Sequence, residues 1–88
     1  MSSLALIVVT PQRKTLEMAV AWVDIPAASG AMRALPEHAP TLGLLGAGAV
    51  RYQPEGGGAE AQLEVSGGFF EVLGDKVTLL ADTASAPA

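Results

Sequence analysis

The segment from residue 59 to residue 66, Ala-Glu-Ala-Gln-Leu-Glu-Val-Ser, alternates strictly between apolar and polar side chains. Successive side chains of a β-strand point to opposite faces of a sheet, so the segment is predicted to be a strand with one face in a core. Leu63 is then buried and Glu64 lies in water. No window of twelve residues in the chain has the spacing of an amphipathic helix. The chain is therefore predicted to fold without helices.

Other segments have the composition of strands and are separated by glycine and proline turns. They are residues 4–9, 15–18, 20–25, 31–35, 49–53, 69–73 and 76–81. The run at 4–9 has no polar alternation, which predicts that both of its faces are covered. Pro26 is predicted to end the strand before it, because proline cannot donate to a ladder. Gly74-Asp75 has the two-residue spacing of a tight hairpin.

Short strands at this spacing predict an all-β domain, a flattened antiparallel β-sandwich of about ten short strands. The domain is expected to span residues 1–84, followed by a frayed tail at 85–88. The pattern does not specify the strand order. Ten apolar side chains are predicted to lie between the two layers: Leu6, Val8, Val23, Ile25, Val50, Leu63, Val65, Val72, Val77 and Leu79.

Composition excludes several kinds of function. The chain has no cysteine, so it has no disulfide, catalytic thiol or cysteine-based zinc site. Its formal net charge is −4, and Arg13 and Lys14 are its only adjacent basic residues, which argues against binding to nucleic acid or anionic lipid. No apolar run approaches the ~20 residues needed to span a bilayer, so direct membrane insertion is not expected. The composition predicts a soluble, cytoplasmic domain.

His38 is the first residue to consider as a catalyst or a metal ligand, because it is the only histidine in the chain. General base catalysis needs a group that orients the imidazole and a nucleophile within reach. The neighbouring Glu37 points away on an extended backbone, and no sequence spacing recruits Ser66 or Asp82. A histidine with scattered carboxylates is also no metal-ligand cluster. We expect a turn histidine that contacts the backbone or a partner, with no catalytic residue, metal or cofactor.

One positive functional signal remains in the residues themselves. Phe69 and Phe70 are adjacent, and adjacent side chains on a strand face opposite ways, so one of them points outward. An exposed aromatic side chain on a small acidic domain suggests a protein interface. This signal alone leaves open a stand-alone β-sandwich that binds a protein or a small ligand.

Several motifs resemble the epsilon subunit of bacterial F-type ATP synthases, whose mitochondrial equivalent is called delta. Residues 36–40, Pro-Glu-His-Ala-Pro, resemble that family's Pro-x-His-Ala-Pro turn, and Gly48-Ala49-Val50-Arg51 resembles the start of the strand after it. Residues 66–72 resemble its (Ser/Gly)-Gly-Gly-(Phe/Ile)-x-Glu-Val segment, and residues 77–84 its closing strand. The motifs occur in the family's order over residues 4–84.

The resemblance implies a β-sandwich in the central stalk, or rotor, that clamps the gamma subunit to the ring of c subunits. It implies a non-catalytic subunit that helps to couple ion translocation to ATP synthesis and hydrolysis. The subunit would be a peripheral part of the synthase at the cytoplasmic face of the inner membrane. By position, the resemblance assigns contacts with gamma and the ring to Ala31, Arg33, Glu37, His38, Ala39 and Pro40.

Two departures from the family pattern bear on function. Ala31 stands where the family often has a glutamate near the ring, and Arg33 stands where a glycine is usual. The ring contact is then altered, with Arg33 as its candidate carrier. The chain also stops at Ala88, where the family's two C-terminal inhibitory helices would begin, so a subunit without that element is expected. A naturally short form and a trimmed piece would look the same.

Overall fold

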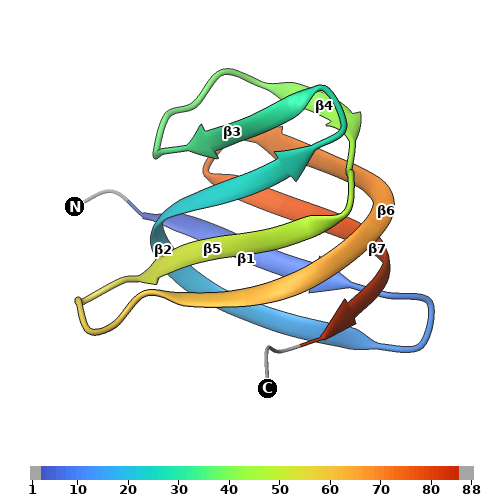
Figure 1. Ribbon diagram of the computed structural model, residues 1–88. Coiled ribbons are helices and arrows are strands. Elements are labelled where there is room, and N and C mark those ends of the chain that lie inside the picture. The colour runs from blue at the N-terminus through green and yellow to red at the C-terminus, as the bar shows by residue number, and fades with distance from the viewer. Residues whose placement is uncertain (1–2, 86–88) are drawn as a thin grey trace.

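The computed structural model describes residues 3–85, all of which lie in strands or in the turns and loops between them (Figure 1). The strands are β1 (Leu4–Val9), β2 (Lys14–Ala27), β3 (Gly30–Ala34), β4 (Thr41–Leu44), β5 (Gly48–Pro54), β6 (Ala61–Leu73) and β7 (Lys76–Ser85). In this part of the chain no helix is long and apolar enough to cross a membrane. The predicted all-β class is confirmed, with seven strands among residues 3–85 instead of about ten.

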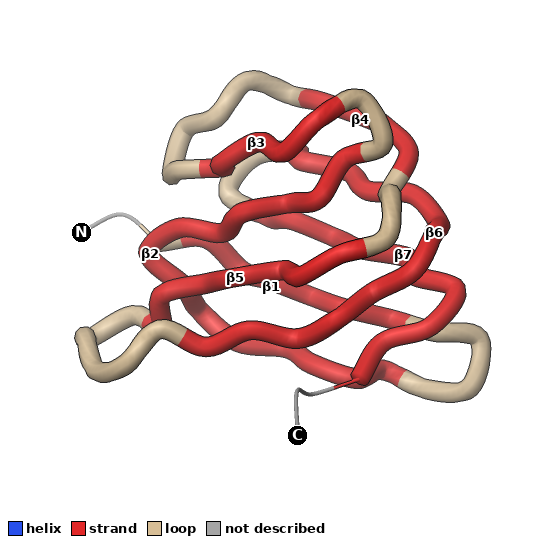
Figure 2. The backbone as a smooth tube through the Cα atoms, in the orientation of Figure 1, coloured by secondary structure: helices blue, strands red, loops and turns tan. Residues whose placement is uncertain are grey.

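The strands form one sheet that closes on itself. Its order is β1-β7-β6-β5-β2-β3, and β1 also pairs with β2, so the sheet returns to its first strand. β4 pairs with β6 beside β5. Figure 2 shows the result as a flattened barrel with two packed layers. The expected sandwich was wholly antiparallel, but β1 and β7 run parallel, because no hairpin joins the first and last strands of the chain.

The strand number is lower than predicted because two long strands each pass from one layer to the other. β6 pairs with β5 through Ala61–Val65 and with β4 through Phe69–Val72. Gly67 and Gly68 lie between the two halves with φ of +69° and +115°, a conformation open to glycine and costly for other residues. The predicted strands on either side of these glycines are therefore one bent strand.

β2 is the other long strand, and it does not end at Pro26 as predicted. The carbonyl of Pro26 accepts a hydrogen bond from the N–H of Gly46 at 2.7 Å. The nitrogen of Pro26 is therefore on the side of the sheet where β4 has ended and β5 has not yet begun. No hydrogen bond between strands is lost there because proline lacks an N–H. β2 continues to Ala27, and a turn at Ala28 and Ser29 leads into β3.

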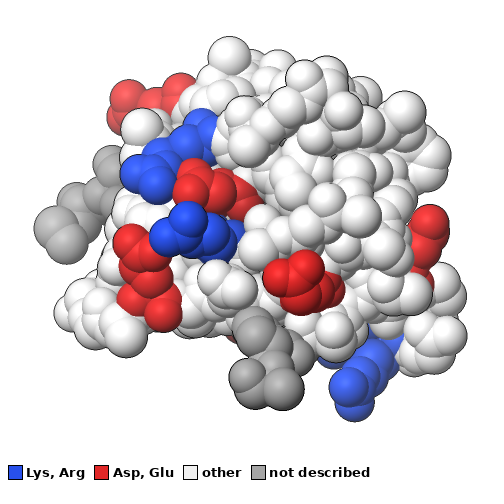
Figure 3. All heavy atoms as spheres, in the orientation of Figure 1, with Lys and Arg blue, Asp and Glu red and all other residues white. Residues whose placement is uncertain are grey.

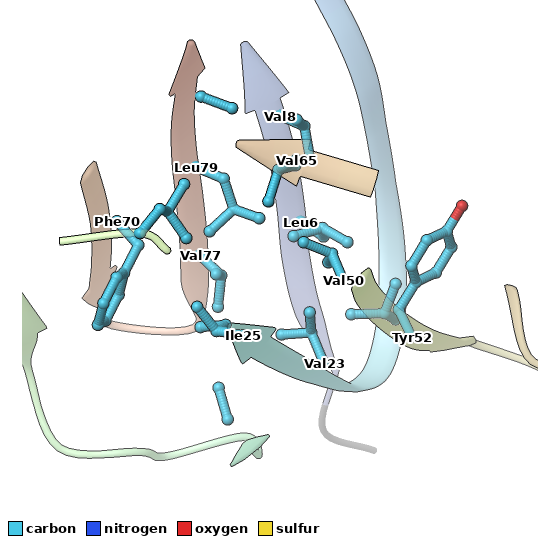
Figure 4. Packing of buried hydrophobic residues seen from close by; sticks show 14 of the residues in the cluster. Leu6, Val8, Val23, Ile25, Val50, Tyr52, Val65, Phe70, Val77 and Leu79 are labelled. Carbon is cyan, nitrogen blue, oxygen red and sulfur yellow. The ribbon is translucent and has the colours of Figure 1, made fainter. Parts of the chain in front are cut away.

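The core lies between the two layers and contains all ten side chains predicted for it, each no more than 5% exposed. In Figure 4, Leu6, Val50 and Val65 lie together at its centre, and Phe70 lies at one side. The structure adds further buried side chains that alternation did not single out: Leu4, Val20, Ala34, Leu45, Tyr52, Phe70 and Ala81. The hydroxyl end of Tyr52 points away from the cluster (Figure 4).

The outer side of β1 corrects a further prediction. Leu4, Leu6 and Val8 are buried, but Ala5 is exposed and Val9 is only half-buried. The run lacks polar residues because its outer side belongs to an apolar surface, not because a second layer covers it. At the other end of the chain, β7 continues through Ser85, and residues 86–88 of the predicted tail lie outside the described residues.

Candidate interaction surfaces

His38 contacts its own loop. Its Nδ1 lies 2.7 Å from the carbonyl oxygen of Ala39, so Nδ1 carries the proton and donates to that oxygen. Ser66 lies elsewhere, with its hydroxyl 2.6 Å from that of Thr83. Among residues 3–85 no hydrogen bond joins His38 to an acid or a nucleophile, and no three metal-binding side chains cluster. This geometry is that of a turn histidine.

The loop from Leu35 to Pro40 is a defined turn that is fixed to the strands below it. The N–H of His38 donates to the carbonyl of Leu35 at 3.0 Å, which closes a turn with Pro36 in its second position. Glu37 takes the third position with φ of +69°, as in a type II turn. The N–H of Glu37 donates to Oδ1 of Asp75 at 2.9 Å, which joins the loop to the hairpin between β6 and β7.

Ala31 and Arg33 are both exposed on β3, away from that loop's contacts. Arg33 donates two hydrogen bonds to Asp24, at 2.7 Å from Nε and 3.0 Å from Nη2. Its guanidinium also lies 3.8 Å from the ring centre of Trp22, a cation–π contact. The hydrogen bonds to Asp24 raise the pKa of Arg33 above its usual value. The structure therefore places the predicted interface residues in two settings, β3 and the loop.

Arg33 belongs to a charged face over β3, β2 and β5. We define the charged face as Trp22, Asp24, Arg33, Arg51 and Glu60. Asp24 is in register with Arg33 on one side and with Arg51 on the other, and Arg51 also lies 3.2 Å from Glu60. Figure 3 shows the basic and acidic side chains interleaved on this side of the molecule. The ionic groups of this face are thus largely satisfied within the chain.

The opposite layer, formed by β4, β6, β7 and β1, has an apolar outer face. We define the apolar face as Leu42, Leu44, Phe69, Leu73 and Leu80, whose exposed fractions run from 50% to 76%. The strand register places Leu44, Phe69, Leu80 and the half-buried Val9 in one row across four strands. A contiguous exposed apolar row is unusual in a monomer and is typical of an interaction site.

The apolar face was only partly foreseen from the sequence. The prediction that one of the two phenylalanines points outward is confirmed, since Phe69 is 60% exposed and Phe70 is 3% exposed. The pairs Leu44-Leu45 and Leu79-Leu80 carry the same signal, because in each pair one leucine is buried and one is exposed. Only the strand register shows that the outward member of each pair lies in a single row.

Comparison with known families identifies the domain. The family described as "ATP synthase, Delta/Epsilon chain, beta-sandwich domain" matches residues 3–87, which is nearly the whole chain. The chain belongs to this family. The resemblance drawn from the turn at residues 36–40 and from the closing strand is confirmed, and so is the β-sandwich class.

Individual relatives agree with this assignment. The ATP synthase epsilon chain of Solibacter usitatus is 48% identical over 82 residues, which cover 93% of this chain and 60% of the relative. The epsilon chain of Alkalihalophilus pseudofirmus is 41% identical over 88 residues, covering 100% of this chain and 65% of the relative. The chain thus spans less than two thirds of the length of these relatives.

Solved structures show the same fold in rotary assemblies. A chain in the Euglena gracilis mitochondrial ATP synthase, solved as OSCP/F1/c-ring, superimposes with a TM-score of 0.89 at 26% identity, covering 98% of this chain and 54% of that chain. A chain of the Tetrahymena thermophila central stalk and c-ring superimposes with a TM-score of 0.73 at 10% identity, covering 94% and 66%. The second likeness shows the fold alone.

Proposed function

We propose that this chain is a rotor subunit of an F-type ATP synthase that holds the gamma subunit against the ring of c subunits. In this role it helps to couple ion translocation to ATP synthesis and hydrolysis and has no chemistry of its own. It would lie peripherally at the cytoplasmic face of the inner membrane as part of the complex. Membership of the epsilon family and the c-ring assembly in which a structural relative was solved support this proposal.

The observation that carries the proposal is the apolar face. Its row of Leu44, Phe69, Leu80 and Val9 crosses four strands in register, and water covers it in the isolated chain. Burial of such a row against a partner contributes roughly 25 cal/mol for each Å² removed from water. The charged face offers no comparable gain, because its Arg33 and Arg51 already have acidic partners. We therefore assign the gamma contact to the apolar face.

The residues assigned by resemblance remain part of the proposed interface. The loop with Glu37, His38, Ala39 and Pro40 connects β3 with β4, whose leucines belong to the apolar face. Its bond to Asp75 fixes the loop before a partner arrives, which reduces the entropy lost on binding. Arg33 is held in place by Asp24 and Trp22. In a contact with the ring it would therefore act as a fixed cation whose charge is partly neutralised by Asp24.

Binding to gamma tests the proposal. The chain is co-expressed with its cognate gamma subunit, and a 1:1 complex that survives gel filtration is expected. Replacing Phe69 and Leu80 together by serine should lower the affinity at least tenfold, about 1.4 kcal/mol. The matched control replaces Arg51 and Glu60 on the charged face by serine and should bind like the wild type.

Two outcomes would contradict the proposal, each in a different part. If the Phe69→Ser, Leu80→Ser variant binds gamma as tightly as the wild type, the apolar face is not the gamma surface. If the wild-type chain stays monomeric in the presence of gamma, the rotor assignment fails and a stand-alone binding module is favoured. Thermal unfolding of each variant shows whether a loss of affinity reflects a loss of fold.

A further inference from the structure

Among residues 3–85, β3 pairs only with β2 and β4 only with β6, and their free edges face a common groove. The β3/β4 groove has a volume of about 490 Å³, and its lining includes Ala28, Gly30, Met32, Leu42, Gly43 and Phe70. At one end the N–H of Ala28 donates to the carbonyl of Leu44 at 2.8 Å. At the opposite end, the loop at residues 35–40 connects the two strands, as the upper part of Figure 2 shows.

The register of β3 shows which of its backbone groups face the groove. Pro26 has no N–H, and its carbonyl accepts from Gly46 on the side away from β3. The pair of Pro26 and Ala31 is therefore of the non-hydrogen-bonded kind. The N–H and C=O of Ala31 point away from β2, and those of Arg33, two residues on, point the same way.

The other wall is set by β4. The N–H of Leu45 donates to the carbonyl of Gly68 on β6, so by alternation Leu44 and Leu42 point their backbone groups away from β6. The carbonyl of Leu44 is used by Ala28, which confirms this direction. The N–H and C=O of Leu42 and the N–H of Leu44 have no backbone partner among residues 3–85.

The floor and walls suit a polypeptide backbone. Met32 and Phe70 form an apolar floor, and Gly43 packs so closely that a Cβ there would lie 2.6 Å from the Phe70 ring. Ala28, Gly30 and Ala31 have small side chains or none, so the backbone of another segment can approach this wall closely. Exposed edges are commonly protected by a charged side chain, but Arg33 is drawn away to Asp24 and Trp22.

We propose that the β3/β4 groove binds an extended segment of the gamma subunit by strand addition, with one apolar side chain of that segment placed over Met32 and Phe70. Backbone groups at Ala31, Arg33 and Leu42 supply the hydrogen bonds of such a contact. This inference rests on the proposed function. Gamma is the expected occupant because β4 carries Leu42 and Leu44 of the apolar face, so a partner on that face reaches the groove without crossing another strand.

Amide hydrogen exchange measured by NMR tests the contact directly. In the free chain the amides of Ala31, Arg33 and Leu42 face solvent and should exchange rapidly. In the complex with gamma the same three amides should be protected. The amide of Met32, which is paired with β2, serves as a reference that is slow in both states. Rapid exchange of the three amides in the complex would overturn the inference.

Two substitutions test it by affinity. Ala31→Pro removes an N–H that no strand among residues 3–85 uses, whereas Ala31→Ser changes the side chain and keeps that N–H. Loss of one hydrogen bond predicts about a threefold to tenfold weaker complex for Ala31→Pro, with Ala31→Ser, which keeps the N–H, binding more tightly than Ala31→Pro. If Ala31→Pro unfolds, Leu42→Pro removes the corresponding N–H of β4. Because this change also removes a side chain of the apolar face, it is compared with Leu42→Ala, relative to which it should bind about threefold to tenfold more weakly.

The outcomes separate this inference from the proposed function. A wild-type chain that binds gamma, with Ala31→Pro folded and as tight as the wild type and Leu42→Pro folded and as tight as Leu42→Ala, contradicts strand addition and leaves the rotor role intact. A wild-type chain that does not bind gamma contradicts both. A wild-type chain that dimerises, with the dimer lost in Ala31→Pro, would show that a second copy occupies the groove and would overturn the assignment to gamma.

Discussion

The charged face and the apolar face are built from the same long strands, yet they satisfy their side chains in different ways. On the charged face, Arg33 bonds to Asp24 and stacks on Trp22, and Arg51 pairs with Glu60. On the apolar face, by contrast, Phe69 and its neighbouring leucines contact water. A face whose groups are paired within the chain gains little from a partner, whereas an exposed apolar row gains from being covered. The difference indicates where the chain is built to bind.

Each long strand changes character where it passes between the layers. β6 carries Glu64 outward in its first half and Phe69 outward in its second half. β2 likewise carries Trp22 and Asp24 on the charged face, while its earlier half pairs with β1 in the layer that carries the apolar face. The two faces therefore share one core, and changes to that core should affect both.

The largest effect is expected for Leu63→Ala, which leaves a cavity in the shared core. Leu63 is 5% exposed, and a buried leucine replaced by alanine typically costs 2–5 kcal/mol. The next residue, Glu64, faces solvent, so Glu64→Ala should change the free energy of unfolding by less than about 0.5 kcal/mol. Urea unfolding of both variants measures the difference. Equal losses at the two positions would show that the register of β6 is wrong.

Gly68→Ala should destabilise the bend in β6, at the point where the strand passes from one layer to the other. A Cβ at this position would collide with the carbonyl oxygen of Leu80, and φ is +115°. We expect a loss of more than about 2 kcal/mol in unfolding free energy. Gly57 also has a positive φ, but a Cβ there has no atom within 4 Å, so Gly57→Ala should cost only about 1 kcal/mol.

Comparable losses for Gly68→Ala and Gly57→Ala would contradict this account of the bend. Backbone strain alone would then explain both values, and close packing of β6 against β7 would not be needed. Urea unfolding at neutral pH is again the measurement.

Glu37→Gly concerns the loop that leads from the charged face to the apolar face. Glu37 holds φ of +69°, which costs a residue with a side chain more than it costs glycine. The substitution keeps the N–H that bonds to Asp75. We expect stabilisation of about 0.5–1 kcal/mol, seen as a higher thermal midpoint. A lower midpoint would indicate that the Glu37 side chain makes a stabilising contact, and Glu37→Ala is the control that removes this side chain without adding glycine.

The smallest effect is expected at the margin of the apolar face, where Lys14 lies 2.6 Å from Glu17. The hydrogen bond from Lys14 lowers the pKa of Glu17 in the folded chain. A lowered folded pKa adds stability above the unfolded pKa, and this contribution is lost as the pH falls through the folded pKa. Because the pair is exposed, Glu17→Gln should only slightly reduce the fall in the free energy of unfolding with decreasing pH below about pH 4.5. A large loss of stability at neutral pH would contradict this reading.

Much of the fold could be predicted from side-chain alternation, because burial on one face leaves a period of two in the sequence. Leu63 and Val65 were identified in this way, and the hairpin at Gly74-Asp75 followed from its spacing. Strand closure could not be predicted, since the parallel pairing of β1 with β7 joins the two ends of the chain. Pro26 was misjudged because the direction of its missing N–H depends on its neighbours in the sheet.

The candidate site was harder to predict because it also depends on which residues of neighbouring strands lie side by side in the sheet. The sequence makes Arg33 the candidate carrier of a ring contact, but it does not show that Asp24 lies opposite Arg33 in the β2/β3 register. β4 was not predicted, because Thr41–Leu44 is short and contains Gly43. The apolar face depends on register across four strands, so neither Phe69 nor Leu80 could be assigned to it from its own segment.

Radical footprinting of side chains in the free chain and in the gamma complex tests the central claim most directly. The exposed Phe69 and Leu80 should react readily in the free chain and become strongly protected in the complex. Trp22 on the charged face should react equally in both. Protection of Trp22 with undiminished reaction at Phe69 and Leu80 would show that the partner covers the charged face, and it would contradict the account.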